Sequence, residues 1–189
     1  MPTFSAMDNQ TPRSGGPVKP AAAAAPAGHD NAAETALLET YYACFAKRDY
    51  RGMAACYHPD IKFKDPIFNL EGKRAAAMWR MLCEGGEDMK IEASGIRAEN
   101  GKGRAHWVAA YTFPATGRKV VNAVDSKFRF RDGKIIDERD EFDFWKWSRQ
   151  ALGLTGWILG WMPRLLQTVQ AKANGNLERF IEKHPEYGA

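Results

Sequence analysis

Four consecutive stretches of the chain alternate apolar and polar residues with a period of two. Such alternation is typical of β-strands that bury one face and expose the other. The links between the stretches are short and carry Gly, Asn, Asp or Pro, which favour tight turns. The sequence therefore predicts an antiparallel meander of four strands, at Met89–Ala98, Arg104–Phe113, Lys119–Phe130 and Lys134–Phe144.

Helical spacing precedes this meander. Apolar residues from Leu37 to Phe45 recur every three or four positions and predict a helix that begins near Glu34. Two shorter helices are predicted at Tyr50–Tyr57 and Arg74–Glu84, with a strand between them that carries Asp65. Helices followed by a meander predict an α+β fold in which the helices pack on one face of the sheet.

The ends of the chain differ in composition from this central part. Residues 1–33 are rich in Ala, Pro and Gly and predict a disordered tail, without the features of a secretory signal. Residues 34–146 form the predicted domain, and residues 147–189 a C-terminal helical extension. The extension contains an apolar run, Leu152–Trp161, whose ten residues are too few to cross a bilayer.

This apolar run has two interpretations. We expect a helix that docks over the core or covers a dimer surface, and a membrane role is not expected. A membrane-surface anchor, with Arg149, Arg164 and Lys172 nearby, is the less favoured alternative.

Composition excludes several classes of function. The net charge is +4, but the basic residues are scattered, so nucleic-acid binding is not expected. Three cysteines without a Cys-x-x-Cys pair predict free thiols in a reducing cytoplasm. The four histidines lack metal-ligand spacing, and no phosphate-binding loop is present. We expect neither a metal nor an organic cofactor.

Asp65 is the first candidate functional residue. Strand alternation puts Ile61, Phe63 and Asp65 on one face and two lysines on the other, so a carboxylate lies on the apolar side. Burial would raise its pKa and make it a candidate general base. The alternative is an ordinary aspartate that turns into solvent at the end of the strand.

The same parity argument predicts which other side chains face inward. An inward aromatic wall is expected from the helices and the meander, and outward positions are expected for His106 and Asp125. Glu138 and Asp140 fall on the inner face, unless they form surface ion pairs. Tyr41 faces inward from the first helix, where a buried hydroxyl needs a partner. The predicted substrate contacts are Trp79, Trp107, Tyr111, Phe113, Asn122, Ser126 and Asp140.

Two segments carry a resemblance to a known family. YYACFAKRDYRGMAACYHPDIKFKDP, which runs from Tyr41 to Pro66, and GRKVVNAVDSKFRFRDGKI are similar to ketosteroid isomerases. The order of elements over residues 34–146 resembles the nuclear transport factor 2-like fold. MWRMLCEGG and FDFWKWSRQALG are similar to SnoaL-like proteins of that fold. The resemblance implies a cone-shaped fold, with helices packed on a curved antiparallel sheet.

The isomerase resemblance also implies roles for residues. Tyr41 is followed 24 positions later by Asp65, and these two occupy the places of the isomerase tyrosine and base. The second acid of the isomerases does not carry over, because Ser126 stands in its place and Asp125 is one residue away. Steroid isomerisation is therefore in doubt, while base-dependent chemistry is not.

The predicted function is cofactor-free acid–base chemistry of the isomerase, cyclase or dehydratase type. Asp65 would be the general base and Tyr41 the hydrogen-bond donor, acting on a small apolar carbonyl compound in an internal pocket. The alternative is a non-catalytic module for small-molecule binding or dimerisation. A homodimer is expected through the outer sheet face, which carries Val108, Ala110 and Thr112.

Overall fold

A computed structural model describes residues 29–188, and most of the predicted tail, residues 1–28, lies outside them. The three N-terminal helices are α1 (Asn31–Ala46), α2 (Tyr50–Cys56) and α3 (Lys73–Gly85). The strands are β1 (Tyr57–Lys64), β2 (Asn69–Glu71), β3 (Lys90–Glu99), β4 (Lys102–Phe113), β5 (Arg118–Arg131) and β6 (Lys134–Glu141). The C-terminal helices are α4 (Phe144–Leu152), α5 (Leu154–Leu159) and α6 (Pro163–Lys183), followed by the short helix η1 (Pro185–Tyr187).

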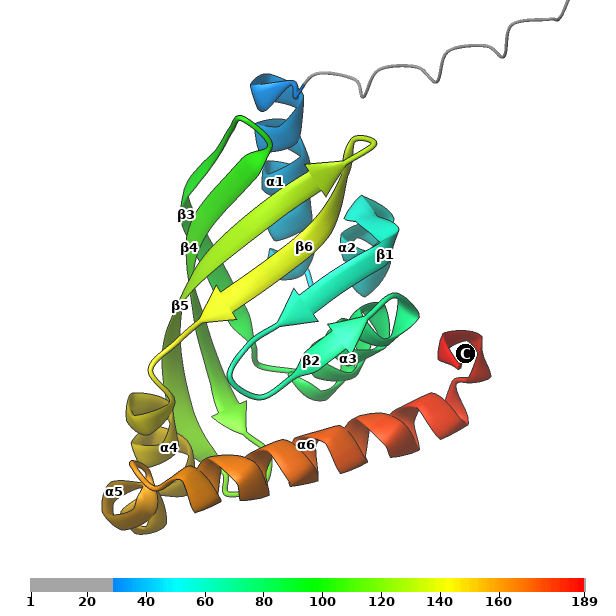
Figure 1. Ribbon diagram of the computed structural model, residues 1–189. Helices are drawn as coiled ribbons and strands as arrows, with labels where there is room; N and C mark the ends of the chain where they lie inside the picture. Colours follow the sequence, from blue (N-terminus) through cyan, green and yellow to red (C-terminus); the bar gives the residue numbers. More distant parts are fainter. Residues whose placement is uncertain (1–28, 189) are drawn as a thin grey trace, which may run out of the picture.

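The strands form one mixed sheet in the order β2-β1-β6-β5-β4-β3. The predicted meander is present as β3 to β6, while β1 joins it by pairing parallel to β6. The sheet curls around α1, α2 and α3, and α6 lies across the wide end of the resulting cone (Figure 1). The predicted α+β class and the helices packed on one face of a curved sheet are confirmed, although the sheet is not antiparallel throughout.

The alternation of burial along the strands follows the predicted parity. Ile61 and Phe63 are buried while Lys62 and Lys64 are exposed. The register between β5 and β6 shifts once, after Arg129. Because of this shift Ile135, and not Ile136 as expected, is fully buried, whereas Glu138 and Asp140 keep their inward positions.

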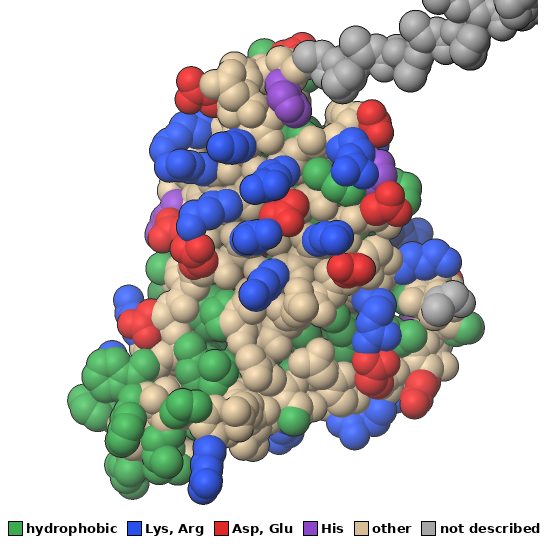
Figure 2. Space-filling model, viewed as in Figure 1, with side chains coloured by type: hydrophobic (Ala, Val, Ile, Leu, Met, Phe, Trp, Pro, Cys, Tyr) green, Lys and Arg blue, Asp and Glu red, His purple; other side chains and the backbone are tan. Residues whose placement is uncertain are grey.

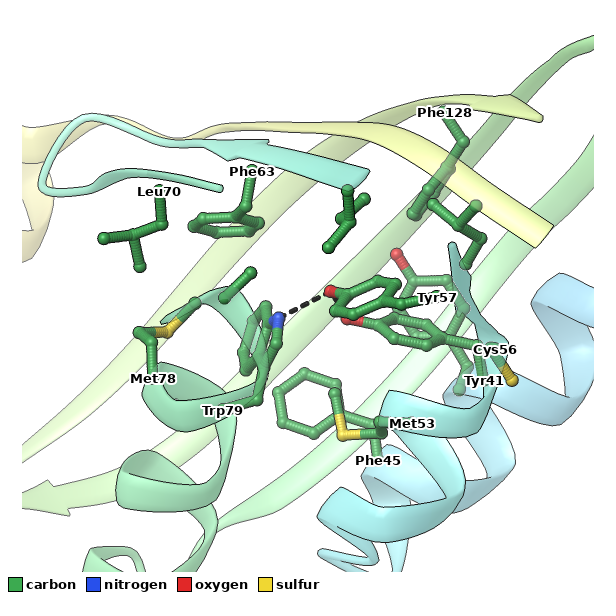
Figure 3. Packing of buried hydrophobic residues seen from close by; sticks show 14 of the residues in the cluster. Tyr41, Phe45, Met53, Cys56, Tyr57, Phe63, Leu70, Met78, Trp79 and Phe128 are labelled. Carbon is green, nitrogen blue, oxygen red and sulfur yellow. Dashed lines mark hydrogen bonds between the residues drawn. The ribbon is translucent and has the colours of Figure 1, made fainter. Parts of the chain in front are cut away.

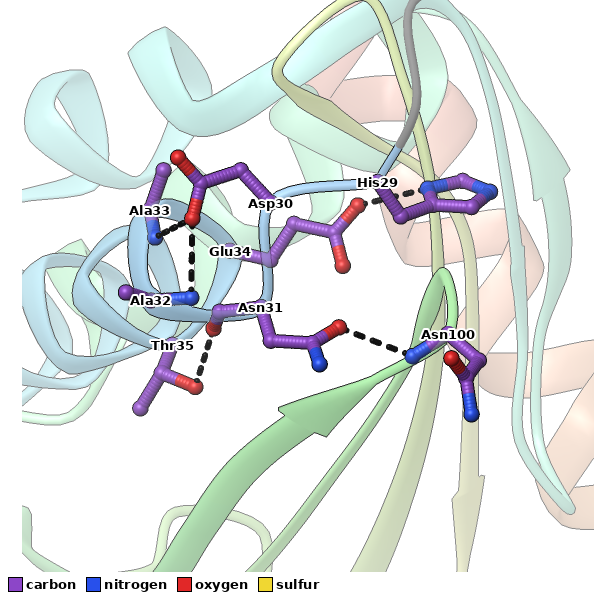
Figure 4. Close-up of polar contacts among 8 residues, drawn as sticks. All are labelled: His29, Asp30, Asn31, Ala32, Ala33, Glu34, Thr35 and Asn100. Atoms are coloured by element: carbon purple, nitrogen blue, oxygen red, sulfur yellow. Dashed lines mark hydrogen bonds and ion pairs between the residues drawn. The ribbon is translucent and has the colours of Figure 1, made fainter.

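The start of α1 is tied to the β3–β4 turn (Figure 4). Asp30 caps the helix by accepting hydrogen bonds from the backbone N–H groups of Ala32 and Ala33, both at 3.0 Å. The Asn31 side chain accepts a bond from the backbone of Asn100 at 2.9 Å. The helix therefore begins at Asn31, three residues before the predicted start of the domain.

Aromatic side chains from helices and strands fill the core (Figure 3). The Phe45 ring lies edge-on to the indoles of Trp79 and Trp107, with ring centroids 4.8 and 5.2 Å apart. The indole of Trp79 donates a hydrogen bond to the hydroxyl of Tyr57 at 2.7 Å. Tyr57 was predicted to end a helix, but it is the first residue of β1 and points into the core.

The C-terminal helices occupy two different environments. Helix α6 buries Leu177 and Ile181 against the domain, whereas Leu154, Trp157 and Ile158 of α5 are exposed. Helix α5 therefore does not dock over the core, and the other half of the prediction for Leu152–Trp161, that it covers a dimer surface, stays a prediction. Within residues 29–188, no helix is both long and apolar enough to span a bilayer.

Candidate functional site

A cavity of about 460 Å³ lies between the inner face of the sheet, α3, α4 and α6. Its wall is mostly apolar, and its size suits a small organic molecule. The lining residues that are exposed to solvent lie at the end of α3, in the β4–β5 turn and on α6, and these three segments form the rim of the cavity. The structure places six of the seven predicted contact residues in its wall, and four of them are aromatic: Trp79, Trp107, Tyr111 and Phe113.

Three polar side chains reach this apolar wall: Asp65 from the turn after β1, and Asn122 and Asp140 from the inner face of the sheet. Each was singled out from strand parity. Polar groups that converge in an otherwise apolar cavity are the usual mark of a binding or catalytic site.

Asp65 is held by the turn that follows β1. Its Oδ1 accepts hydrogen bonds from the backbone N–H groups of Ile67 at 2.7 Å and Phe68 at 2.5 Å. No hydrogen bond within residues 29–188 uses Oδ2. Burial raises the pKa of Asp65 to about 6, and the two backbone bonds oppose this rise. The carboxyl group is thus half ionised near pH 6 and mostly ionised at neutral pH.

Asp140 is held by a chain of side chains across the sheet. The indole of Trp107 donates to Ser126 Oγ at 2.9 Å, and the Ser126 hydroxyl donates to Asp140 Oδ1 at 2.5 Å. Asp140 is only 4% exposed, and burial raises its pKa to about 7, against the effect of the Ser126 bond. The negative charge of Asp65 adds to this rise, so each carboxyl lies within the electrostatic field of the other.

The pairing of β5 with β6 brings a carboxyl group next to Ser126. Asp140 is the direct partner of Ser126 across the ladder. Sequence parity put Asp140 on the inner face but could not show that it hydrogen-bonds Ser126.

Tyr41 does not line the cavity, and this corrects the prediction that it meets the substrate. It is 1% exposed, and its hydroxyl lies 2.9 Å from the hydroxyl of Tyr57 and 3.2 Å from both carboxylate oxygens of Glu138. Tyr57 also bonds to Glu138. Burial raises the pKa of Glu138 well above its ordinary value, and the charge of Asp140 adds to the effect. The hydrogen bond from the Trp79 indole to Tyr57 links this network to the cavity wall.

Ser126 likewise lies outside the cavity lining, and its role is to hold Asp140. Asp125 and His106 face outward, as predicted, and are hydrogen-bonded to each other at 2.9 Å. Within the described part of the chain, no group of three or more His, Cys, Asp or Glu side chains is arranged to hold a metal ion.

A family model for the SnoaL-like domain matches residues 38–138. The chain belongs to the SnoaL-like family. A search of curated proteins finds no match.

Solved structures of the same fold cover most of this SnoaL-like chain. An epoxide hydrolase of the LEH-like type from M. tuberculosis is 20% identical, with a TM-score of 0.56 over 69% of this chain and 98% of its own. TsrD from Streptomyces laurentii is 24% identical, with a TM-score of 0.56 over 67% and 99%. A candidate polyketide cyclase from Xanthomonas campestris pv. campestris is 19% identical, with a TM-score of 0.55 over 64% and 98%. At these identities the likeness shows the fold.

Proposed function

We propose that this protein binds a small apolar carbonyl compound in its cavity and catalyses proton transfer on it without a cofactor. Asp65 is the general base and Asp140 the general acid. One observation carries the proposal: two carboxyl groups with raised pKa values share one apolar cavity. Titratable groups of this kind are the usual parts of an acid–base site.

The two carboxyl groups are suited to different halves of the reaction. Asp65 has the lower pKa and is the group that ionises first, so its Oδ2 accepts a proton from the carbon next to the carbonyl. Asp140 keeps its proton to higher pH and donates a hydrogen bond to the carbonyl oxygen as that oxygen gains negative charge. A positioned base contributes roughly 10²–10⁴-fold, and an oxyanion donor roughly 10²–10³-fold.

The fold neighbours support a small-molecule site. One is named as an epoxide hydrolase and another as a candidate polyketide cyclase, and neither name requires a macromolecular substrate. The nature of the cavity supports the same class, because an apolar wall with few polar groups selects a small, mostly apolar ligand.

The proposal is tested by proton exchange. The protein is incubated in D₂O with a panel of small apolar ketones, and deuterium uptake next to the carbonyl is followed by NMR. We expect Asp65→Asn to abolish the exchange and Asp140→Asn to lower it by roughly 10²–10³-fold. Tyr41→Phe should exchange protons at a rate within a few-fold of the wild-type rate, because the Tyr41 hydroxyl does not reach the cavity.

The control is Asp125→Asn, which removes a carboxyl from the outer face of the same sheet. It should exchange protons at the wild-type rate. An Asp65→Asn protein that retains the activity would contradict the base role. Quenching of tryptophan fluorescence by the ketones, with no exchange in any of them, would favour the binding-only alternative.

A further inference from the structure

Helices α4 and α5 form a corner of the molecule where large apolar side chains are left uncovered. We call it the tryptophan corner, and Figure 2 shows hydrophobic side chains gathered there. Leu154 is 75% exposed, Trp157 59% and Trp161 73%, and Ile158 and Trp145 are exposed beside them. So many exposed apolar side chains in one place mark an interaction site.

The corner is rigidly built. A Cβ atom at Gly156 would overlap the backbone of Ser148, so α5 lies directly on α4 at this point. Helix α4 is in turn fixed to the sheet, because the hydroxyl of Thr116 donates to the carbonyl of Ala151 at 2.6 Å and Arg118 donates to that of Gln150 at 2.7 Å. The apolar side chains of α5 are thus held outward by packing beneath them.

Cations predominate around the corner, and Asp143, which caps α4 beside Lys146, is a carboxylate at its edge. Residues 144–177 contain no Asp or Glu, and their cations are Lys146, Arg149, Arg164 and Lys172. The Arg149 guanidinium lies 4.0 Å from the centre of the Trp145 ring and 5.0 Å from that of Trp157. Within residues 29–188 its buried Nε has no hydrogen-bond partner. The corner therefore combines exposed indoles with an excess of cations over carboxylates.

We propose that the tryptophan corner docks on an anionic lipid surface. Tryptophan side chains favour the boundary between headgroups and acyl chains, and nearby Lys and Arg are attracted to anionic headgroups. A second copy of the chain fits less well. A symmetric contact would bring this set of cations against itself, with no carboxylate in residues 144–177 to neutralise them.

Docking would also place the cavity close to the lipid. Trp147 and Leu152 of α4 and Val169 and Lys172 of α6 line the cavity, and α4 forms part of the corner while α6 begins next to it. An apolar ligand that partitions into the bilayer would then be concentrated beside the cavity. The docking itself does not depend on the proposed proton transfer and is measured without substrate.

The test is co-flotation of the full chain with vesicles. One set contains phosphatidylcholine alone, and the other contains phosphatidylcholine and phosphatidylglycerol in equal parts. We expect binding to the anionic vesicles that weakens as salt is added. Trp157→Ser combined with Trp161→Ser should abolish it. Arg164→Glu should lower the partition coefficient at least about fivefold.

The matched control is Arg179→Glu, an exposed charge reversal at the far end of the same helix α6. It should bind like the wild type, and circular dichroism should show that all variants are folded. Two results would overturn the proposal. The double tryptophan variant could float as well as the wild type. Alternatively, the wild type could fail to bind any vesicle. If light scattering then shows a dimer for the wild type and a monomer for the double tryptophan variant, a second copy of the chain covers the corner.

Discussion

Asp65 and Asp140 show what strand parity can and cannot predict about a single side chain. Parity put both carboxyl groups on the inner face, and the structure places both in the cavity lining. Strand parity also put Ser126 inward, and helical spacing put Tyr41 inward, but these two lie behind the wall. How far an inward side chain lies from the cavity depends on the curl of the sheet and on Trp79, which lies between the Tyr41 network and the cavity. A one-dimensional pattern does not contain that information.

Ser126 offers a test at the scale of one residue. Its hydroxyl donates to Asp140 and stabilises the ionised form, which lowers the pKa of that carboxyl. Ser126→Ala should therefore raise the pKa of Asp140 further and move the pH dependence of proton exchange in the same direction. The measurement is the pH–rate profile. An unchanged profile would mean that the Ser126 bond does not act on Asp140.

At the scale of elements, the meander was predictable because each of its strands pairs with a neighbour in the sequence. Predicted and observed ends of β3 to β6 differ by no more than three residues. The three-residue strand β2 was missed because it is too short to show a period. The parallel pairing of β1 with β6 was missed because it joins segments far apart in the chain.

Strand β6 carries a prediction for stability, because Glu138 and Asp140 both lie on its buried face. Their folded-state pKa values are raised, so the folded protein holds more protons than the unfolded chain from about pH 4 to about pH 7 and above. The free energy of unfolding should therefore fall as the pH rises through this window.

The Asp140→Asn variant removes one of these groups while keeping an acceptor for Ser126. We expect it to raise the free energy of unfolding at pH 8 by up to about 4 kcal/mol. It should have little effect at pH 4, where the carboxyl is protonated in the folded protein. Urea unfolding at the two pH values measures this. Equal effects at both values would contradict a buried carboxyl with a raised pKa.

At the scale of the whole molecule, the outer face of the sheet is divided. Basic side chains cover the part near the β5–β6 hairpin (Figure 2), including Arg104, Lys127, Arg129 and Arg131, which are exposed. The other part carries Val108, Ala110 and Val121, of which Val121 is 52% exposed. A dimer contact is expected to use this second, apolar part of the face.

The dimer prediction concerns the mass of the protein in solution. Light scattering should give twice the chain mass of 21.1 kDa. Val121→Glu should shift the mass toward one chain, because it puts a charge into the contact. Lys127→Glu, on the basic part of the same strand, is the control and should leave the mass unchanged. A mass of one chain at every protein concentration would contradict the prediction of a dimer.

The proposed function combines these scales. A curved sheet and helices enclose an apolar cavity, to which β6 and the turn after β1 each supply one carboxyl group. An NMR titration of the Asp65 and Asp140 carboxyl carbons, assigned with the two Asn variants, tests this most directly. We expect pKa values of about 6 for Asp65 and about 7 for Asp140. Removing Asp65 should lower that of Asp140. Two carboxyls that titrate independently, near or below the ordinary value of about 4, would contradict the acid–base pair.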